Sequence, residues 1–104
     1  AGDWRVVQGA GLPVGTSLRF DPGQAVIAGR ALPVTDAGRG RLVLDGAPLW
    51  IYWIDADDRT AALGDPDGRR VWIMDRTGPA GERLRVAREI LGWYGYDLTR
   101  LEGA

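Results

Sequence analysis

Residues 49–77 read LWIYWIDADDRTAALGDPDGRRVWIMDRT, three short apolar runs separated by polar turns. In the turn DPDG at 65–68, Pro suits a φ near −65° and Gly tolerates a positive φ. Short runs rich in Val, Ile, Leu, Trp and Tyr that are joined by such turns are typical of antiparallel strands. This segment therefore predicts three consecutive strands of an antiparallel sheet.

The same rhythm extends back to Trp4, with turn residues at intervals of about ten residues. Short strands at such regular spacing indicate an antiparallel sandwich or barrel. We expect eight of them, near residues 4–8, 16–20, 25–28, 30–34, 41–44, 49–54, 60–63 and 70–75.

After residue 79 the period of the apolar positions changes. Leu84, Ala87 and Leu91 recur at helical spacing among charged residues, which predicts one amphipathic helix over about 80–92. Gly92 should end this helix, and a last extended strand is expected over about 96–101. We expect the apolar face of the helix to pack on the outside of the strands.

Length and composition predict one domain over residues 1–104, with a single core. The 13 basic residues, all Arg, are scattered along a chain of net charge −1, so no basic stripe is available for a nucleic-acid backbone. No apolar run approaches the roughly 20 residues of a bilayer-spanning helix. We therefore expect no nucleic-acid partner, and membrane association only through a lipid anchor outside this chain.

Catalytic chemistry has few routes in this sequence. His and Cys are absent and Ser17 is the only serine, so neither a His-based triad nor a thiol nucleophile can be built. The Asp-rich turns fail the pattern of a twelve-residue calcium loop, because Arg59 and Pro66 fall where ligands are required. We expect a binding protein rather than an enzyme, without catalytic residues, metal or cofactor. A weaker hypothesis is an enzyme whose catalytic carboxylate is Asp45 or Asp75, inside a barrel.

Several segments resemble those of the lipocalins, most closely the bacterial lipocalins of the outer-membrane lipoprotein type. Gly2 and Trp4 match the family's Gly-x-Trp signature, and Asp57 stands in place of the Asp in its Thr-Asp-Tyr signature. Arg76 stands where the family's conserved Arg ends the last barrel strand, and GYDLTRL at 95–101 is typical of the bacterial group. The chain departs from the pattern at Asp58, where the family usually has Tyr, and in a shortened segment before residue 49.

The resemblance implies an all-β fold with one helix. Its barrel is an eight-stranded antiparallel up-and-down barrel over about 2–77, with the helix packed on its outside and a final extended strand. It also implies that Trp4 lies across the closed end of the barrel and that Arg76 packs on it. Gly2, Trp4, Asp57 and Arg76 are then structural signature residues.

Strand alternation places Trp50 and Tyr52 on one face of their strand, and Trp72 and Met74 on one face of the last strand together with Arg76. We predict that Trp50, Tyr52, Trp72 and Met74 point inward and line a ligand cavity. Trp53 should then point outward, under the helix. Large aromatic residues also fill the interiors of small barrels. A barrel interior filled by its own side chains is therefore as good an interpretation of these aromatic residues as a ligand cavity.

The predicted function is binding, with transport or storage, of a small hydrophobic ligand, a fatty acyl or other lipid-like molecule. Arg19, Arg30 and Arg41 are candidates for holding its head group. The alternative is a ligand-free structural or interaction module of the cell envelope with a side-chain-filled barrel. The sequence leaves open whether the protein forms a homodimer. The resemblance implies a location in the periplasm or cell envelope.

Overall fold

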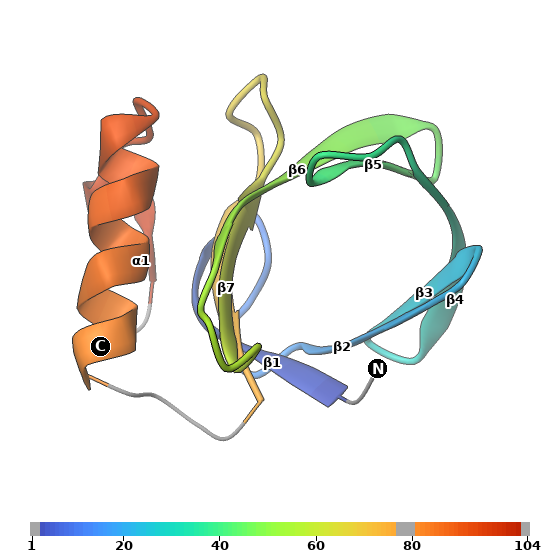
Figure 1. Ribbon diagram of the computed structural model, residues 1–104, viewed down its shortest axis with the longest axis horizontal. Helices are drawn as coiled ribbons and strands as arrows, with labels where there is room; N and C mark the ends of the chain where they lie inside the picture. The colour runs from blue at the N-terminus through green and yellow to red at the C-terminus, as the bar shows by residue number, and fades with distance from the viewer. Residues whose placement is uncertain (1–2, 77–80, 103–104) are drawn as a thin grey trace.

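The computed structural model describes residues 3–76 and 81–102 and contains a closed barrel with one helix beside it (Figure 1). Each strand pairs antiparallel with the next, and the first closes on the last. The predicted eight-stranded antiparallel barrel with a helix after it is confirmed. The elements are β1 (Asp3–Ala10), β2 (Ser17–Asp21), β3 (Gln24–Ile27), β4 (Arg30–Asp36), β5 (Arg41–Leu44), β6 (Ala47–Ile54), β7 (Thr60–Gly64), β8 (Val71–Asp75), α1 (Gly81–Trp93) and a 3-10 turn, η1 (Leu98–Arg100).

Two-residue turns allow the short first half of the chain to complete a barrel. Ala28 and Gly29 join β3 to β4, and Asp45 and Gly46 join β5 to β6. All four residues have a positive φ, between 49° and 83°. A two-residue turn with two positive φ angles matches the right-handed twist of the strands on either side. Few residues are therefore needed to connect these strands.

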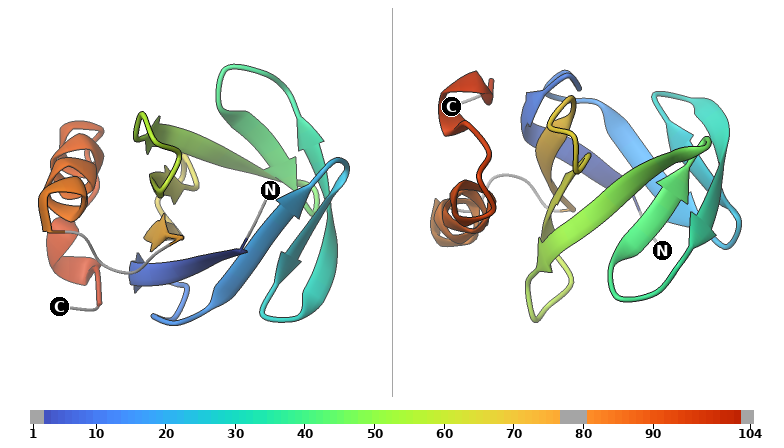
Figure 2. Two further views of the ribbon diagram at one scale, coloured as in Figure 1. Left: turned by 60° about the horizontal axis from the view of Figure 1, so that its bottom comes forward. Right: turned by 90° about the horizontal axis from the view of Figure 1, so that it is seen from above.

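The barrel wall lies between the barrel interior and α1 (Figure 2). One apolar cluster lies inside the wall, and a second lies between its outer face and α1. Alternating residues of each strand supply the inner cluster, as the pleat requires. The inner cluster is built on Trp4, Val6, Leu18, Ala25, Leu44, Leu49, Ala61, Leu63, Trp72 and Met74. The outer cluster is built on Ala10, Ala62, Val71, Ile73, Ala87, Leu91 and Leu101.

The helix packs on β7, with β6 and β8 on either side of the contact. Ala87 and Leu91 are fully buried in the outer cluster and Leu84 is partly buried there, as the helical spacing predicts. Ala62 of β7 is also fully buried in this cluster. Small side chains on both surfaces allow the helix to lie close to the wall.

The expected final strand over 96–101 is wrong. The side chain of Asp97 accepts a hydrogen bond from the backbone N–H of Thr99 at 3.0 Å and caps η1 instead. Asp and Thr side chains that bond to nearby backbone groups compete with strand pairing in this way. Up to Glu102, the last residue that the structure describes, one antiparallel bridge follows, between Glu102 and Gly9 of β1.

Candidate functional site

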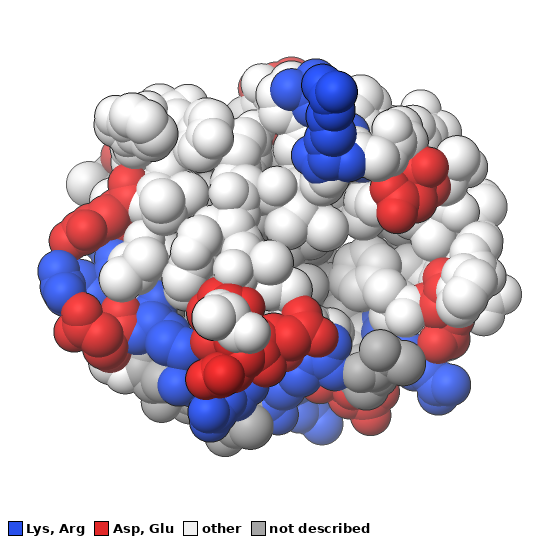
Figure 3. Space-filling view, viewed as in Figure 1, with Lys and Arg blue, Asp and Glu red and all other residues white. Residues whose placement is uncertain are grey.

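A cavity of about 360 Å³ opens at one end of the barrel, between the β2–β3 turn and the end of β6. The molecular surface is hollowed at this end of the barrel (Figure 3). Most of the lining side chains are apolar and come from seven of the eight strands. They are Trp4, Phe20, Val34, Leu42, Ile51, Ile54, Ala61, Leu63 and Met74, joined by Asp21, Pro22, Gly23, Asp36 and Arg76.

The other end of the barrel is filled. Trp72, Leu44, Leu49 and Leu18 are each at most 1% exposed and meet in the inner cluster. Trp72 therefore points inward, as predicted, but it packs below the cavity rather than lining it. Met74, one inward position further along β8, does line the cavity.

The contact between Trp4 and Arg76 is confirmed. The Arg76 guanidinium carbon lies 4.1 Å from the centroid of the Trp4 ring, a cation–π arrangement. Arg76 Nη2 also lies 3.2 Å from Asp58 Oδ2, so the residue that departs from the family signature supplies a carboxylate to the signature arginine. Because both Trp4 and Arg76 line the cavity and it opens beside them, the expectation that this end is closed is wrong.

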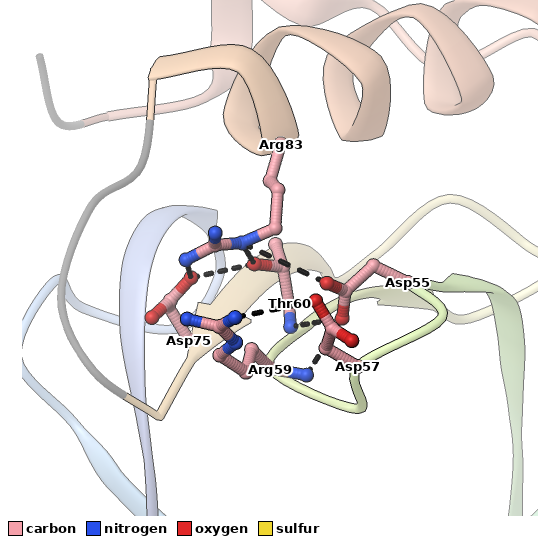
Figure 4. Close-up of polar contacts among 6 residues, drawn as sticks. All are labelled: Asp55, Asp57, Arg59, Thr60, Asp75 and Arg83. Atoms are coloured by element: carbon pink, nitrogen blue, oxygen red, sulfur yellow. Dashed lines mark hydrogen bonds and ion pairs between the residues drawn. The ribbon is translucent and has the colours of Figure 1, made fainter.

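Signature residue Asp57 lies on the surface, where its carboxylate forms an ion pair with Arg59 at 3.2 Å. It belongs to a network of polar side chains that joins the β6–β7 loop to α1 (Figure 4). Gly2, the remaining signature residue, lies outside the described residues.

At the centre of this network, Thr60 and Asp75 are buried side by side on the outer side of the barrel wall. The Thr60 hydroxyl donates to Asp75 Oδ2 at 2.6 Å and accepts from Arg83 Nε at 2.8 Å. Arg83 Nη2 lies 3.6 Å from Asp75 Oδ2. A helix residue thereby supplies the positive charge that a buried carboxylate requires.

Asp55 ends the network at the loop. Burial of its carboxylate opposes ionisation, but hydrogen bonds from the backbone N–H groups of Thr60 and Arg59 and the charge of Arg83 outweigh burial and lower the pKa of Asp55. The network is thus satisfied internally and ties the helix to the loop. We interpret it as a structural tie rather than a reactive site.

Trp50 and Tyr52 point outward, so the expectation that they line the interior is wrong. Residues 49 and 51 of β6 face the barrel interior, and the pairing with β7 shifts register between Ile51 and Trp53. This bulge leaves Tyr52 without an opposite residue and places both Tyr52 and Trp53 in the outer cluster. The outward direction predicted for Trp53 is confirmed.

The other candidates from the sequence also lie away from the cavity. Asp45 is exposed in the β5–β6 turn, and Asp75 is engaged with Thr60 and Arg83 on the outer side of the wall. None of the three arginines proposed for a head group lines the cavity; these are Arg19, Arg30 and Arg41. Within residues 3–76 and 81–102, no group of three or more potential metal ligands is found.

No protein-family model matches this chain, and no curated protein matches it either. The resemblance to lipocalins therefore rests on the segments that carry it, and the structure establishes the coarser feature, a closed antiparallel barrel of eight strands. In the described part of the chain, no helix combines the length and apolar character needed to cross a membrane.

Proposed function

We propose that the protein binds a small hydrophobic molecule, such as a short acyl chain or a single ring system, in the cavity beside Trp4 and Arg76. The observation that carries this proposal is the apolar lining of a cavity of about 360 Å³ in an otherwise packed barrel. That volume is at the lower end of the roughly 300–1,000 Å³ usual for ligand pockets. Each methylene buried there contributes about 0.8 kcal/mol.

The polar residues at the mouth favour a neutral or cationic polar end on the ligand. Asp21 and Asp36 both line the cavity, and Asp21 is paired with Arg19 at 3.2 Å. Arg76, the one basic side chain among the described residues of the lining, already contacts Trp4 and Asp58. A fatty acid carboxylate would meet like charges at the rim, whereas an alcohol, amide or amine would find acceptors.

Transport or storage of such a ligand is part of the same proposal. The resemblance to bacterial lipocalins supports a role in the periplasm or cell envelope, with membrane association through a lipid anchor outside the chain. The Trp4–Arg76 contact supports that assignment, because it is the contact that the resembling segments imply.

The second candidate is a structural or interaction module that holds no ligand. The filled end of the barrel favours it, because Trp72, Leu44 and Leu49 are each at most 1% exposed and pack in the inner cluster. The two candidates differ in whether the remaining cavity takes up a molecule from solution.

The test is a calorimetric titration with straight-chain alcohols from hexanol to dodecanol, and with carboxylates of the same lengths. Affinity should rise about fourfold per methylene and level off once the chain exceeds the cavity. At each length the alcohol should bind more tightly than the carboxylate.

Two variants locate the binding. Ile54 lines the cavity and is 45% exposed, so Ile54→Trp should narrow the mouth and abolish binding without disturbing the core. The matched control is Val43→Trp, because Val43 is 38% exposed and lies outside the cavity lining. Absence of binding at every chain length would favour the ligand-free module.

A further inference from the structure

A second concave site lies on the outside of the barrel, between β5, β6 and the C-terminal end of α1. It is a cleft of about 230 Å³ to which Arg39, Arg41, Trp50, Tyr52 and Tyr94 contribute. Trp50 belongs to a strand position that faces away from the barrel interior, so this outer cleft lies on the outer side of the wall. Among the described residues, Ile51 lines both the outer cleft and the cavity. Occupation of one site does not require the other.

Aromatic rings form one side of the outer cleft. The Tyr52 and Tyr94 ring centroids lie 4.6 Å apart, and the Trp50 and Tyr52 centroids lie 6.2 Å apart. The row continues from Tyr94 to Trp93, whose ring centroid lies 6.0 Å away. Trp93 is 83% exposed and Tyr94 is 55% exposed. Large aromatic residues this exposed are typical of surfaces that bind another molecule.

Arginines form the other side. The Arg41 guanidinium carbon lies 4.2 Å from the Trp50 ring centroid, which places the guanidinium over the indole face. Over the described residues, neither Arg39 nor Arg41 has an ion pair or side-chain hydrogen bond. Most other arginines of the chain pair with Asp or Glu, as Arg70 does with Asp65 at 3.0 Å. The outer cleft therefore holds two exposed arginines whose N–H groups have no acceptor among the described residues of the protein.

These two sides define the chemistry of a complementary ligand. A guanidinium stacked on a ring keeps its N–H edge available for two parallel hydrogen bonds to a carboxylate. The neighbouring tyrosines offer ring faces and edges to a flat ligand. The volume of the outer cleft admits one small ring system with its charged group, not a larger ligand.

We propose that the outer cleft binds a small aromatic carboxylate, with the ring against Tyr52 and Tyr94 and the carboxylate on Arg39 and Arg41. This site is distinct from the barrel cavity and prefers the opposite charge. Trp50 and Tyr52 are thus binding residues on the outer face of the wall rather than the inner one.

The experiment is a titration of the whole chain with naphthoate, followed by heteronuclear NMR. Saturable shifts should appear at the Trp50 indole N–H and at backbone amides 39–41, and Arg41→Leu should weaken binding about tenfold or more. The matched control is Arg30→Leu, because Arg30 is exposed and its loss changes the net charge equally. The uncharged analogue naphthylmethanol should bind more weakly than naphthoate.

Three results would overturn the proposal. They are the absence of saturable shifts, equal weakening by Arg41→Leu and Arg30→Leu, and shifts confined to cavity residues such as Leu42 and Met74. Ile54→Trp, which narrows the barrel cavity, should leave naphthoate binding unchanged. Failure of naphthoate binding is therefore separable from failure of alcohol binding inside the barrel.

Discussion

The two ends of the barrel interior are built from the same strands but are packed differently. At one end Trp72, Leu44 and Leu49 are essentially inaccessible to solvent. At the other end Phe20 and Leu42 are only partly buried and border a cavity of about 360 Å³. The inward side chains thus pack closely at one end and leave space between them at the other.

Two strands show where the cavity ends. Both inward residues of β7, Ala61 and Leu63, line it. On β8, Met74 lines the cavity and Trp72 fills the space below it. A barrel of this size can thus be stabilised at one end and remain open for a ligand at the other.

The largest effect is expected at the filled end. Trp72→Ala should destabilise the protein by about 3–5 kcal/mol, because it removes a fully buried ring and leaves a cavity. Phe20→Ala, at the open end, should cost only about 1 kcal/mol, since that ring is already partly solvated. Urea unfolding followed by circular dichroism measures both values.

A control keeps this comparison specific to packing. Trp72 Nε1 is buried and lacks a hydrogen-bond partner in the described part of the chain. Trp72→Phe keeps most of the ring and removes that unpaired group, so it should cost much less than Trp72→Ala. Equal losses for Trp72→Ala and Phe20→Ala would show that the two ends are packed alike.

A smaller effect is expected from the contact at the open end. Arg76→Ala should destabilise by about 1–2 kcal/mol, because it removes the guanidinium from the Trp4 ring and from Asp58. The matched control is Arg59→Ala, whose exposed pair with Asp57 should contribute less than about 1 kcal/mol. If both variants unfold at the same urea concentration, the Trp4 contact contributes nothing to the open end.

The smallest expected effect is the loss of the stability contributed by Asp55 at acidic pH. Because the folded pKa of Asp55 is lowered, its contribution to stability is present above the unfolded pKa of about 3.9 and is lost as the pH falls through the folded value. Asp55→Asn should therefore be less stable than the parent protein at neutral pH, and the difference should shrink below about pH 4.

Thermal unfolding from neutral to acidic pH measures this difference, with Asp57→Asn as the exposed control. Hydrogen exchange at acidic pH should show earliest loss of protection at Arg59 and Thr60, whose amides bond to the Asp55 carboxylate. A difference that is constant over the whole pH range would contradict the role assigned to Asp55.

Of the four residues predicted to line the cavity, Trp72 and Met74 point inward and Met74 lines the cavity, whereas Trp50 and Tyr52 point outward for a physical reason. Trp72 and Met74 share the inward phase of β8 with Arg76, whose contact with Trp4 anchors that phase. Trp50 and Tyr52 had no such anchor. The helix covers the outer face of β6, β7 and β8, so both faces of these strands are apolar. Alternation of polar and apolar residues therefore does not indicate which face of these strands points outward.

By itself, the sequence determined the number and order of the strands and the helix that follows them, because turn residues and periodicity are local features. The contact between Trp4 and Arg76 was implied by the resemblance to lipocalins, and the structure contains it. The tertiary structure decided the rest. The bulge at Tyr52 depends on which residues of β7 lie opposite β6. The open end depends on the summed volumes of side chains from strands far apart in the chain, which meet only when the barrel has closed.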